Sequence, residues 1–219
     1  YPATILSQNN KSVLLLEKNK EIGPKVCAGG ISRKSRKLLN LPSKLIGGTF
    51  SNIIFKTSWL ESTLEFGEDY MYTIDREALG QWQLKKLKNS KIEVRTKANV
   101  TSVERERVTI NNSEKIEFRY LIGADGSNSI VRRHVGLKTR KIGVAFHYLV
   151  PQKYSNIEIY FDSKLFHSWY SWIFPQGEYT SIGFGCSPVI LPILKARKNF
   201  EDWAKKYNID ISQGKFQAH

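Results

Sequence analysis

Two acidic residues follow short apolar segments and could bind a nucleotide. Glu17 comes directly after residues 13–16, and Asp125 comes directly after residues 120–124. At the carboxyl ends of parallel strands, such acids accept hydrogen bonds from the ribose of a dinucleotide. Glu17 could equally be a surface residue that leaves a buried strand, because no glycine-rich phosphate-binding turn precedes it in the sequence.

A glycine-containing motif surrounds the second acid. Residues 123–133 read Gly-Ala-Asp-Gly-Ser-Asn-Ser-Ile-Val-Arg-Arg. Glycines such as Gly126 allow a ligand to approach the backbone closely, and Ser127 and Asn128 favour the start of a helix. The N-terminus of a helix attracts phosphate groups. An ordinary strand, turn and helix would give the same pattern, so this motif alone does not establish a nucleotide site.

Aromatic residues at alternate positions could line an apolar cavity. Alternate residues of a strand share one face, so their rings would form a broad wall. Glycines on a facing strand would leave room beside that wall. The alternative is an ordinary aromatic core of a β-sheet. The six wall residues are Tyr170, Trp172, Phe174, Pro175, Gly183 and Gly185.

The cysteines and histidines predict no metal site. The two cysteines, Cys27 and Cys186, lack the paired spacing of metal ligands. They are also too few for a disulfide framework, which is consistent with a reducing cytosol. The histidines are scattered along the chain, at His134, His147, His167 and His219. No serine lies in the sequence context of a hydrolase nucleophile.

The chain is strongly basic, with 34 Lys and Arg against 20 Asp and Glu and a formal net charge of +14. Such a charge attracts nucleic acid, an anionic membrane face or a phosphate-bearing cofactor. A coding bias towards lysine, with solvated faces, explains it equally well. The basic clusters at residues 33–37 and 132–141 lack the interleaved aromatic residues of a single-strand binder, so no nucleic-acid partner is expected. No apolar segment approaches the ~20 residues that span a bilayer, and no leader sequence is visible.

Mixed helices and strands must position these residues. Short apolar segments that end in an acid predict buried parallel strands at residues 13–17 and 120–126. Leucines at helical spacing predict a helix over residues 74–87 behind an Asp75 cap. The other predicted helices cover residues 3–8, 32–39, 127–133 and 194–207. An alternating pattern predicts strands within residues 49–73, where the inward residues would be Ile53, Phe55, Leu64 and Phe66. Strands are also predicted within residues 100–117, with a turn at Asn111 and Asn112. The remaining predicted strands are residues 92–95, 144–150, 157–161, 169–174 and 180–185.

In series, these motifs resemble the geranylgeranyl reductase family of FAD-dependent oxidoreductases, which have a flavoprotein hydroxylase-like fold. Residues 123–133 are similar to the second nucleotide-binding signature of flavoprotein hydroxylases. Residues 23–32 resemble the Lys-x-Cys-Gly-Gly-Gly segment that lies along the flavin, although Ala28 replaces the first glycine. Residues 72–79 resemble the family's arginine-containing helix start. Residues 170–185 resemble the Tyr-x-Trp-x-Phe-Pro and Gly-x-Gly pattern that lines its lipid-substrate cavity.

The resemblance implies roles for individual residues. Cys27 would lie near the flavin, either as a catalytic proton donor or only as packing. Arg76 would help to hold the cofactor, or would only form an ion pair with Asp75. Residues 98–100 resemble the segment whose backbone faces the adenine, with an ordinary strand start as the alternative. The six wall residues would bind the substrate. The implied cofactor-binding residues are Glu17, Lys25, Cys27, Ala28, Arg76, Val100, Asp125 and Gly126.

The resemblance also implies an α/β fold, α+β overall, in which an FAD-binding Rossmann-like three-layer domain is interleaved with an antiparallel β-sheet substrate domain. The FAD-binding domain would comprise residues 1–48 and 74–137, and the substrate-binding domain residues 49–73 and 138–219. The chain would then be the central part of the enzyme, without the first strand, its glycine turn and a later Gly-Asp segment. Such a fragment could carry the scaffold without holding FAD tightly, and could be inactive.

The implied activity is the reduction of C=C double bonds in the prenyl (geranylgeranyl) chains of isoprenoid lipids. Reduced FAD would supply hydride to one carbon and an acid would supply a proton to the other, after NAD(P)H or another donor had reduced the flavin. An FAD-dependent monooxygenase of the same fold is the alternative enzyme, and a lipid- or nucleic-acid-binding module is the non-enzymatic alternative. The expected location is cytoplasmic, peripheral on the inner face of an anionic membrane.

Overall fold

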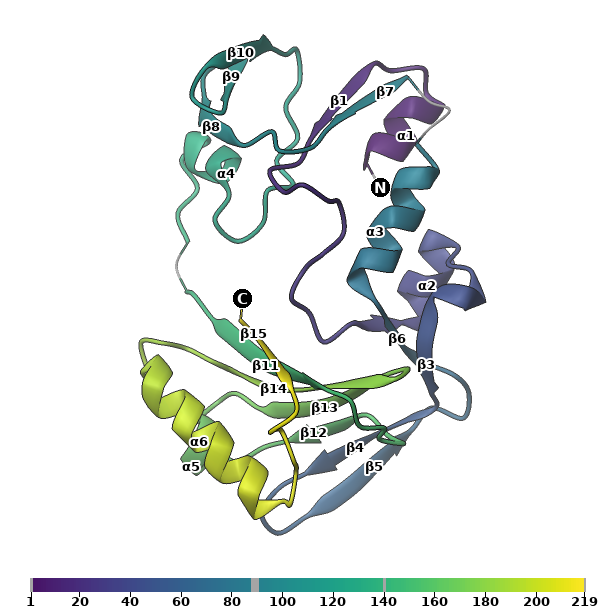
Figure 1. The fold of residues 1–219 in the computed structure, drawn as a ribbon, viewed down its shortest axis with the longest axis vertical. Coiled ribbons are helices and arrows are strands. Elements are labelled where there is room, and N and C mark those ends of the chain that lie inside the picture. The colour runs from purple at the N-terminus through teal and green to yellow at the C-terminus, as the bar shows by residue number, and fades with distance from the viewer. Residues whose placement is uncertain (1, 88–90, 140, 219) are drawn as a thin grey trace. The chain divides into compact units, whose positions relative to one another are not determined.

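The computed structural model describes residues 2–87, 91–139 and 141–218. Arg140 of the second basic cluster and His219 lie outside the described residues. The chain forms two compact units, and each is built from two separate stretches of sequence (Figure 1). The first unit comprises Tyr1–Pro24 and Gly80–Lys141, and the second comprises Lys25–Leu79 and Ile142–His219. The predicted mixture of helices and strands is confirmed.

The first unit contains a short parallel sheet and a separate antiparallel sheet. Helix α1 (Pro2–Gln8) precedes strand β1 (Val13–Leu16), which pairs in parallel with β7 (Ile92–Arg95). Asn111 and Asn112 connect the last two strands of the antiparallel sheet with positive φ angles of 51° and 61°, so the predicted turn is confirmed. That sheet has the order β10-β9-β8 and consists of β8 (Val100–Val103), β9 (Arg107–Ile110) and β10 (Glu114–Glu117).

One predicted strand of this unit is wrong. Residues 120–126 form no strand, and Tyr120 and Ile122 are exposed. Apolar side chains alone do not make a strand, because its backbone N–H and C=O groups must pair with a neighbour. Within the described part of the chain, β1 and β7 pair only with each other and offer residues 120–126 no such neighbour. The helix that follows, α4 (Ile130–His134), is capped by Ser129 and not by the predicted residues 127 and 128.

The second unit is built on a seven-stranded sheet with the order β15-β11-β14-β13-β12-β4-β5. Neighbouring strands are antiparallel except β12 and β4, which are parallel. The strands are β4 (Asn52–Lys56), β5 (Glu61–Glu65), β11 (Val144–Val150), β12 (Glu158–Tyr160), β13 (Ser171–Gln176), β14 (Tyr179–Cys186) and β15 (Lys215–Ala218).

A smaller antiparallel sheet and several helices complete this unit. The small sheet has the order β2-β6-β3 and consists of β2 (Gly30–Ser32), β3 (Ile46–Phe50) and β6 (Met71–Ile74). Helix α3 (Arg76–Lys85) follows β6 and continues into the first unit. The other helices are α2 (Arg33–Leu39), the 3₁₀ helix η1 (Ser43–Leu45), α5 (Ser163–Phe166) and α6 (Ile193–Lys206).

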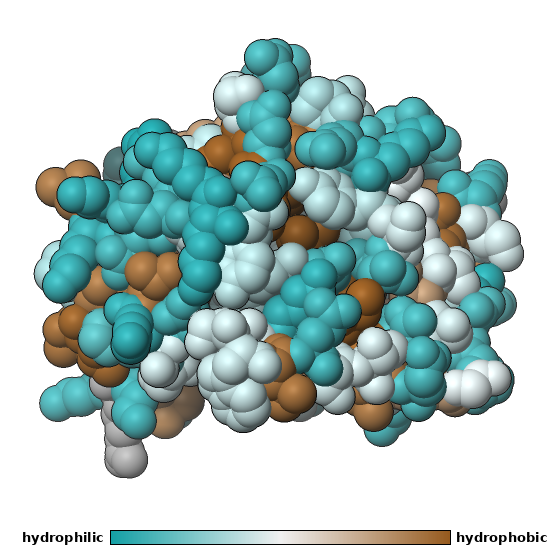
Figure 2. Space-filling model, turned by 90° about the horizontal axis from the view of Figure 1, so that it is seen from below, coloured by the Kyte–Doolittle hydropathy of each residue, from teal (hydrophilic) through white to brown (hydrophobic). Residues whose placement is uncertain are grey.

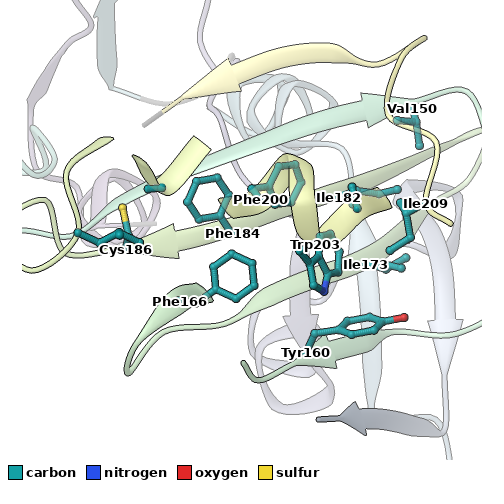
Figure 3. Packing of buried hydrophobic residues seen from close by; sticks show 13 residues of the cluster. Val150, Tyr160, Phe166, Ile173, Ile182, Phe184, Cys186, Phe200, Trp203 and Ile209 are labelled. Atoms are coloured by element: carbon teal, nitrogen blue, oxygen red, sulfur yellow. The ribbon is translucent and has the colours of Figure 1, made fainter. Parts of the chain in front are cut away.

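The core of the second unit lies between one face of the seven-stranded sheet and helices α5 and α6 (Figure 3). Phe184 of β14 stacks on Phe200 of α6 with ring centroids 4.9 Å apart, and Phe166 of α5 packs beside Phe184. Burying each of these rings stabilises the fold by about 1.5–3 kcal/mol. The buried residues of α6 recur at helical spacing and are Ala196, Phe200, Trp203 and Ala204.

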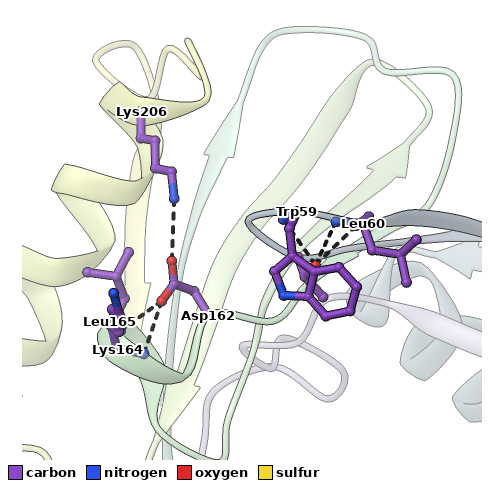
Figure 4. A network of polar contacts seen from close by, with 7 residues as sticks. Trp59, Leu60, Asp162, Lys164, Leu165 and Lys206 are labelled. Atoms are coloured by element: carbon purple, nitrogen blue, oxygen red, sulfur yellow. Dashed lines mark hydrogen bonds and ion pairs between the residues drawn. The ribbon is translucent and has the colours of Figure 1, made fainter.

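Polar contacts fix α5 against α6 (Figure 4). The Asp162 carboxylate accepts hydrogen bonds from the N–H groups of Lys164 and Leu165, at 3.0 and 3.2 Å, and so caps α5. Its other oxygen lies 3.5 Å from the Lys206 ammonium of α6. One carboxylate therefore both caps the short helix and ties it to the long one.

The hairpin predicted within residues 49–73 is confirmed, but the inward direction of Leu64 is wrong. Leu64 lies opposite Ile53 in the β4–β5 pair and is 47% exposed, whereas Ile53, Phe55 and Phe66 are half-buried. Strand β5 is the edge of the sheet and is exposed along its whole length. An alternating pattern predicts which residues share a face, but it does not say whether anything covers that face.

The two compact units divide the chain at other residues than the predicted domains do. Residues 25–48 and 74–79, which the sequence assigns to the FAD-binding domain, fall in the second unit. Their neighbour Thr73 donates a 2.5 Å hydrogen bond to the carbonyl of Pro175 in β13. The side-chain amide of Gln176 donates to the carbonyl of Ala28. These bonds join the small sheet and the segment before it to β13.

Candidate functional site

Glu17 and residues 98–100 lie together in the first unit, although about 80 residues separate them in the sequence. The N–H of Ala98 donates to the carbonyl of Glu17 at 2.9 Å, and Val100 begins β8. The Glu17 carboxylate accepts the N–H of Asn19 at 2.8 Å and is half-buried. The structure therefore brings together two of the segments to which the sequence assigns contacts with an adenosine.

Asp125 is held at the N-terminus of α4. Its Oδ2 accepts hydrogen bonds from the N–H groups of Ile130 and Val131, at 2.7 and 3.2 Å. Burial acts to raise the pKa of Asp125, but hydrogen bonds from the Ser129 hydroxyl and from these backbone groups outweigh it, so the pKa lies below its ordinary value. The acid is therefore ionised at neutral pH and caps the helix.

Two glycines of the motif around Asp125 act in different ways. Gly126 has a φ of +79°, and a Cβ added there would meet no atom within 4 Å. Its left-handed backbone thus favours glycine and leaves open space beside the turn. A Cβ on Gly123 would lie 2.6 Å from the side chain of Val131, so this glycine allows the turn to pack on α4. The role of Gly123 was not predicted individually, although the residue lies within the motif.

The segment that contains Cys27 is fixed in the second unit. Lys25 and Cys27 are exposed, and the Cys27 sulfur accepts the N–H of Gly29 at 3.4 Å. The Gly29 carbonyl accepts the N–H of Ile74 at 3.1 Å. Gly29 has a φ of +78°, and a Cβ there would lie 2.5 Å from the Gln176 amide nitrogen and 2.6 Å from the carbonyl of Ile74. Only glycine fits this position.

Gln176 is a site residue that the sequence analysis missed. It follows Pro175 at the end of β13, and its amide holds the carbonyl of Ala28. Because Ala28 and Gln176 are far apart in the sequence, no local pattern signals this contact. The bond connects the segment that resembles the flavin-side segment to the strand that carries the aromatic rings.

Arg76 begins α3 directly after Asp75, the residue that caps this helix. The Asp75 carboxylate accepts the N–H of Ala78 at 2.7 Å, and within the described ranges no ion pair joins it to Arg76. The Nε of Arg76 is buried and has no hydrogen-bond partner in the part of the chain that the structure describes. Buried N–H donors are normally paired, so this guanidinium fits an acceptor supplied by a bound cofactor.

The three aromatic side chains lie on the face of the seven-stranded sheet opposite α6. Trp172 and Phe174 alternate along β13, and Tyr170 packs edge-on against Trp172 with ring centroids 6.2 Å apart. Tyr170 is exposed, Phe174 half-buried and Trp172 buried. Pro175 alternates with Phe174 and so lies on the other face, opposite Thr180.

Glycines make room for these rings. Gly183 pairs with Trp172, and a Cβ there would lie 2.6 Å from the indole. A Cβ on Gly185 would lie 2.6 Å from the ring of Trp169, and one on Gly30 would lie 2.7 Å from the ring of Phe174. The predicted glycines of β14 therefore stand against aromatic rings. Gly30 and Trp169 join the same arrangement without having been predicted.

A buried polar chain fixes the Trp172 indole. His147, 2% exposed, lies 2.7 Å from the Ser181 hydroxyl through Nδ1 and 2.9 Å from the Gln217 Oε1 through Nε2. The indole N–H donates to the Ser181 oxygen at 3.1 Å. An amide oxygen only accepts, so Nε2 carries the proton, and the Ser181 hydroxyl donates to Nδ1. Every member is then satisfied with a neutral His147.

The pKa of His147 is lowered by burial, and the Gln217 hydrogen bond opposes this effect only in part. The neutral imidazole that the hydrogen-bond pattern requires is thus also the form that burial favours. His147 was singled out in the sequence only as one of four scattered histidines. Its position opposite Gly183 in the β11–β14 pair gives it a role that only the sheet register reveals.

Comparison with known proteins places these features in a family. Residues 56–166, about half of the chain, match the family model described as FAD binding domain. The chain is 28% identical over 192 residues to geranylgeranyl diphosphate reductase from Rhodobacter capsulatus, covering 79% of this chain and 48% of that protein. It is 29% identical over 205 residues to digeranylgeranylglycerophospholipid reductase 1 from Methanococcoides burtonii, covering 84% and 50%.

A solved structure shows the same fold. The crystal structure of a geranylgeranyl bacteriochlorophyll reductase-like protein from Thermoplasma acidophilum matches with a TM-score of 0.85 at 19% identity, covering 99% of this chain and 61% of that one. The chain spans about half the length of the curated relatives it matches. The matched residues include β12, which pairs with β13, and the turn at Asp125. The chain therefore belongs to the family of FAD-binding domains, and FAD is its cofactor.

Proposed function

We propose that this chain is part of an FAD-dependent oxidoreductase that reduces C=C double bonds of prenyl chains, such as geranylgeranyl chains, in isoprenoid lipids. The observation that carries the proposal is the row of aromatic rings on β13 with glycines fitted against them. Relatives named geranylgeranyl and digeranylgeranylglycerophospholipid reductases support the same reading. A broad apolar surface suits an isoprenoid, which has no polar group along its chain.

The protein would hold and orient the prenyl chain of the substrate. Trp172 and Phe174 would exclude water from the alkene, and the glycines beside them let the rings pack closely against the sheet. When bound and reduced by NAD(P)H or another donor, FAD would supply the hydride. In this proposal Pro175, which lies on the other face, shapes β13 and does not touch the lipid.

The proposed cofactor contacts follow from the geometry of each segment. Arg76 would donate its buried N–H to an acceptor on FAD, and Lys25 would add positive charge. Backbone groups at Ala28, Val100 and Gly126 would approach the cofactor. Glu17 would accept hydrogen bonds from the ribose. The Asp125 carboxylate already caps α4, so we propose that it orients the turn for the cofactor.

Cys27 is the candidate proton donor. Its thiol is exposed, so a substrate could reach it. In the full-length protein, Cys27→Ala should lower the rate of double-bond saturation at least about a hundredfold while FAD absorbance is retained, because general acid catalysis contributes factors of about 10²–10⁴. Unchanged saturation would leave Cys27 as a packing residue only.

The overall proposal is tested by the full-length protein with a digeranylgeranyl phospholipid under anaerobic conditions and reduced flavin. Visible absorption should show bound flavin, and mass spectrometry should show hydrogens added to the prenyl chains. Oxygen consumption with a hydroxylated product would instead identify a monooxygenase of the same fold. A colourless protein would favour a lipid- or nucleic-acid-binding module.

We also propose that the protein works in the cytoplasm at the inner face of an anionic membrane. The net charge of +14 supports this, because basic proteins are attracted to anionic lipid. No helix within the described residues has the length and apolar character to cross a bilayer. In this proposal the protein binds the membrane surface through its basic side chains and other surface contacts.

A further inference from the structure

An exposed apolar segment follows β14 and continues into the first two residues of α6. Residues 187–194 read Ser-Pro-Val-Ile-Leu-Pro-Ile-Leu. Val189 is 90% exposed, Leu194 is 85% exposed, and Ile190 and Ile193 are exposed as well. Single exposed apolar residues are ordinary, but four within six positions form a patch that calls for a partner. Figure 2 views the molecule from the end at which α6 lies, and there brown hydrophobic patches interrupt the hydrophilic surface.

The exposed conformation of this segment is fixed by local structure. Leu191 is 2% exposed and packs in the core beneath α6. The Ser187 carbonyl accepts the N–H groups of Ile190 and Leu191, at 3.0 and 2.8 Å. The Pro192 carbonyl accepts the N–H of Ala196 at 2.9 Å and starts the helix. One leucine thus anchors the segment while its neighbours are held outward.

Positive charge follows directly after the apolar residues. The sequence from residue 187 to residue 200 contains no Asp or Glu and contains Lys195, Arg197 and Lys198. Lys195 and Lys198 are exposed and form no ion pair within the described residues. Arg197 is held by Glu201 at 3.2 Å and lies over the ring of Phe216. Lys195 and Lys198, which form no ion pair within the described residues, therefore lie next to the exposed apolar residues 189–194.

We propose that residues 189–194 insert into the interfacial region of an anionic bilayer, with Lys195 and Lys198 contacting the lipid head groups. Apolar side chains with adjacent basic residues are the combination that binds such an interface, because burial and charge attraction add. A second copy of the chain is the poorer occupant, since a two-fold contact would bring the same lysines against each other. The inference deepens the proposed function, because it names the surface that reaches the membrane holding the lipid substrate.

Vesicle binding by the full-length protein tests the insertion. Leu194→Ser combined with Val189→Ser should weaken binding to phosphatidylglycerol-containing vesicles at least about tenfold, because two apolar side chains lose their burial in lipid. The matched control is Tyr179→Ser, which removes an exposed apolar side chain at the other end of β14 and should leave binding unchanged. Lys195→Gln with Lys198→Gln should weaken binding to these vesicles but not to phosphatidylcholine vesicles. Equal binding by the Leu194 and Tyr179 variants would overturn the proposal.

An environment-sensitive dye gives a readout that is independent of affinity. In a Cys27→Ser background, a dye on Leu194→Cys should shift to the blue when vesicles are added, and a dye on Tyr179→Cys should not. A blue shift that grows with protein concentration in the absence of vesicles would identify a second copy as the occupant and overturn the proposal.

The assays separate this inference from the proposed function. Lipid reduction with detergent-solubilised substrate should be unchanged in the Leu194 and Val189 variant, because these residues are not in the proposed site. Vesicle binding without any double-bond reduction would reject the reductase and leave the insertion standing. Double-bond reduction without vesicle binding would reject the insertion and leave the reductase proposal standing.

Discussion

At the scale of residues, His147 shows how burial and hydrogen bonding select one protonation state. Its two ring nitrogens are used by Ser181 and Gln217, and Ser181 in turn holds the indole of Trp172. A proton added to His147 would remove the acceptor that the Ser181 hydroxyl needs. The orientation of an aromatic ring in the proposed lipid site thus depends on a neutral histidine.

This dependence predicts an acid-sensitive stability. The pKa of His147 is below its unfolded value of about 6.5. Below about pH 6.5 the unfolded chain therefore binds a proton that the folded chain does not, and the free energy of unfolding should fall by at most about 1.4 kcal/mol per pH unit. Urea unfolding at pH 7.5 and pH 5.5 measures the change. His147→Gln should lose this part of the pH dependence, and an identical slope in the variant would contradict the assignment.

Two glycines with the same backbone conformation form a matched pair. Gly29 and Gly126 have φ angles of +78° and +79°, but only Gly29 has neighbours where a Cβ would lie. Gly126→Ala should cost about 1–2 kcal/mol from the left-handed backbone alone. Gly29→Ala adds steric overlap with Gln176 and the carbonyl of Ile74, so its cost should be clearly larger. Thermal unfolding of the two variants checks the order, and equal losses would refute the crowding at Gly29.

At the scale of elements, α6 depends on the rings that it buries. Trp203 is fully buried between Phe200 and Tyr160, and its indole N–H has no hydrogen-bond partner in the described chain. The indole ring therefore stabilises the fold through packing alone. Replacing it by a phenyl ring would break no hydrogen bond, because the indole N–H makes none within the described chain. This separates the effect of the ring's volume from that of its polar group.

Substitutions of Trp203 should reflect this difference. Trp203→Ala should lower the free energy of unfolding by about 3–5 kcal/mol through loss of burial and a cavity. Trp203→Phe should cost less than about half of that, because it keeps an aromatic ring and removes an unpaired buried donor. Urea denaturation gives both values. A phenylalanine variant as unstable as the alanine variant would mean that the indole N–H is satisfied in solution.

Helices and strands were predictable where the sequence has a regular apolar pattern and other elements bury the apolar face that the pattern predicts. The helix over residues 194–207 and the central strands β13 and β14 repeat apolar residues at the right period and bury them. Residues 120–124 have the apolar composition of a strand but no neighbour to pair with. Leu64 has the right alternation but lies on an edge strand that nothing covers. The periodicity of apolar residues is a local property of the sequence, whereas strand pairing and the burial of a strand's face depend on the tertiary structure.

At the scale of the whole molecule, the net charge of +14 acts at long range. Attraction to anionic vesicles should weaken steeply between about 0.05 and 0.5 M salt, because the Debye length shortens from well above 10 Å towards a few Å. Sedimentation of the full-length protein with phosphatidylglycerol vesicles measures this. If residues 189–194 also insert, a salt-resistant fraction should remain and should disappear in the Leu194 and Val189 variant. Binding that salt does not change would refute the electrostatic part.

The sequence by itself determined the positions of the glycine and aromatic motifs and the family resemblance that implies FAD, because such motifs depend on residue types at short spacing. The tertiary structure alone decided that Pro175 leaves the aromatic face, that Gln176 holds the Ala28 carbonyl and that Ser181 and His147 fix Trp172. Each of these depends on strand register or on contacts between distant segments. Such contacts carry no local periodicity, so only the folded chain reveals them.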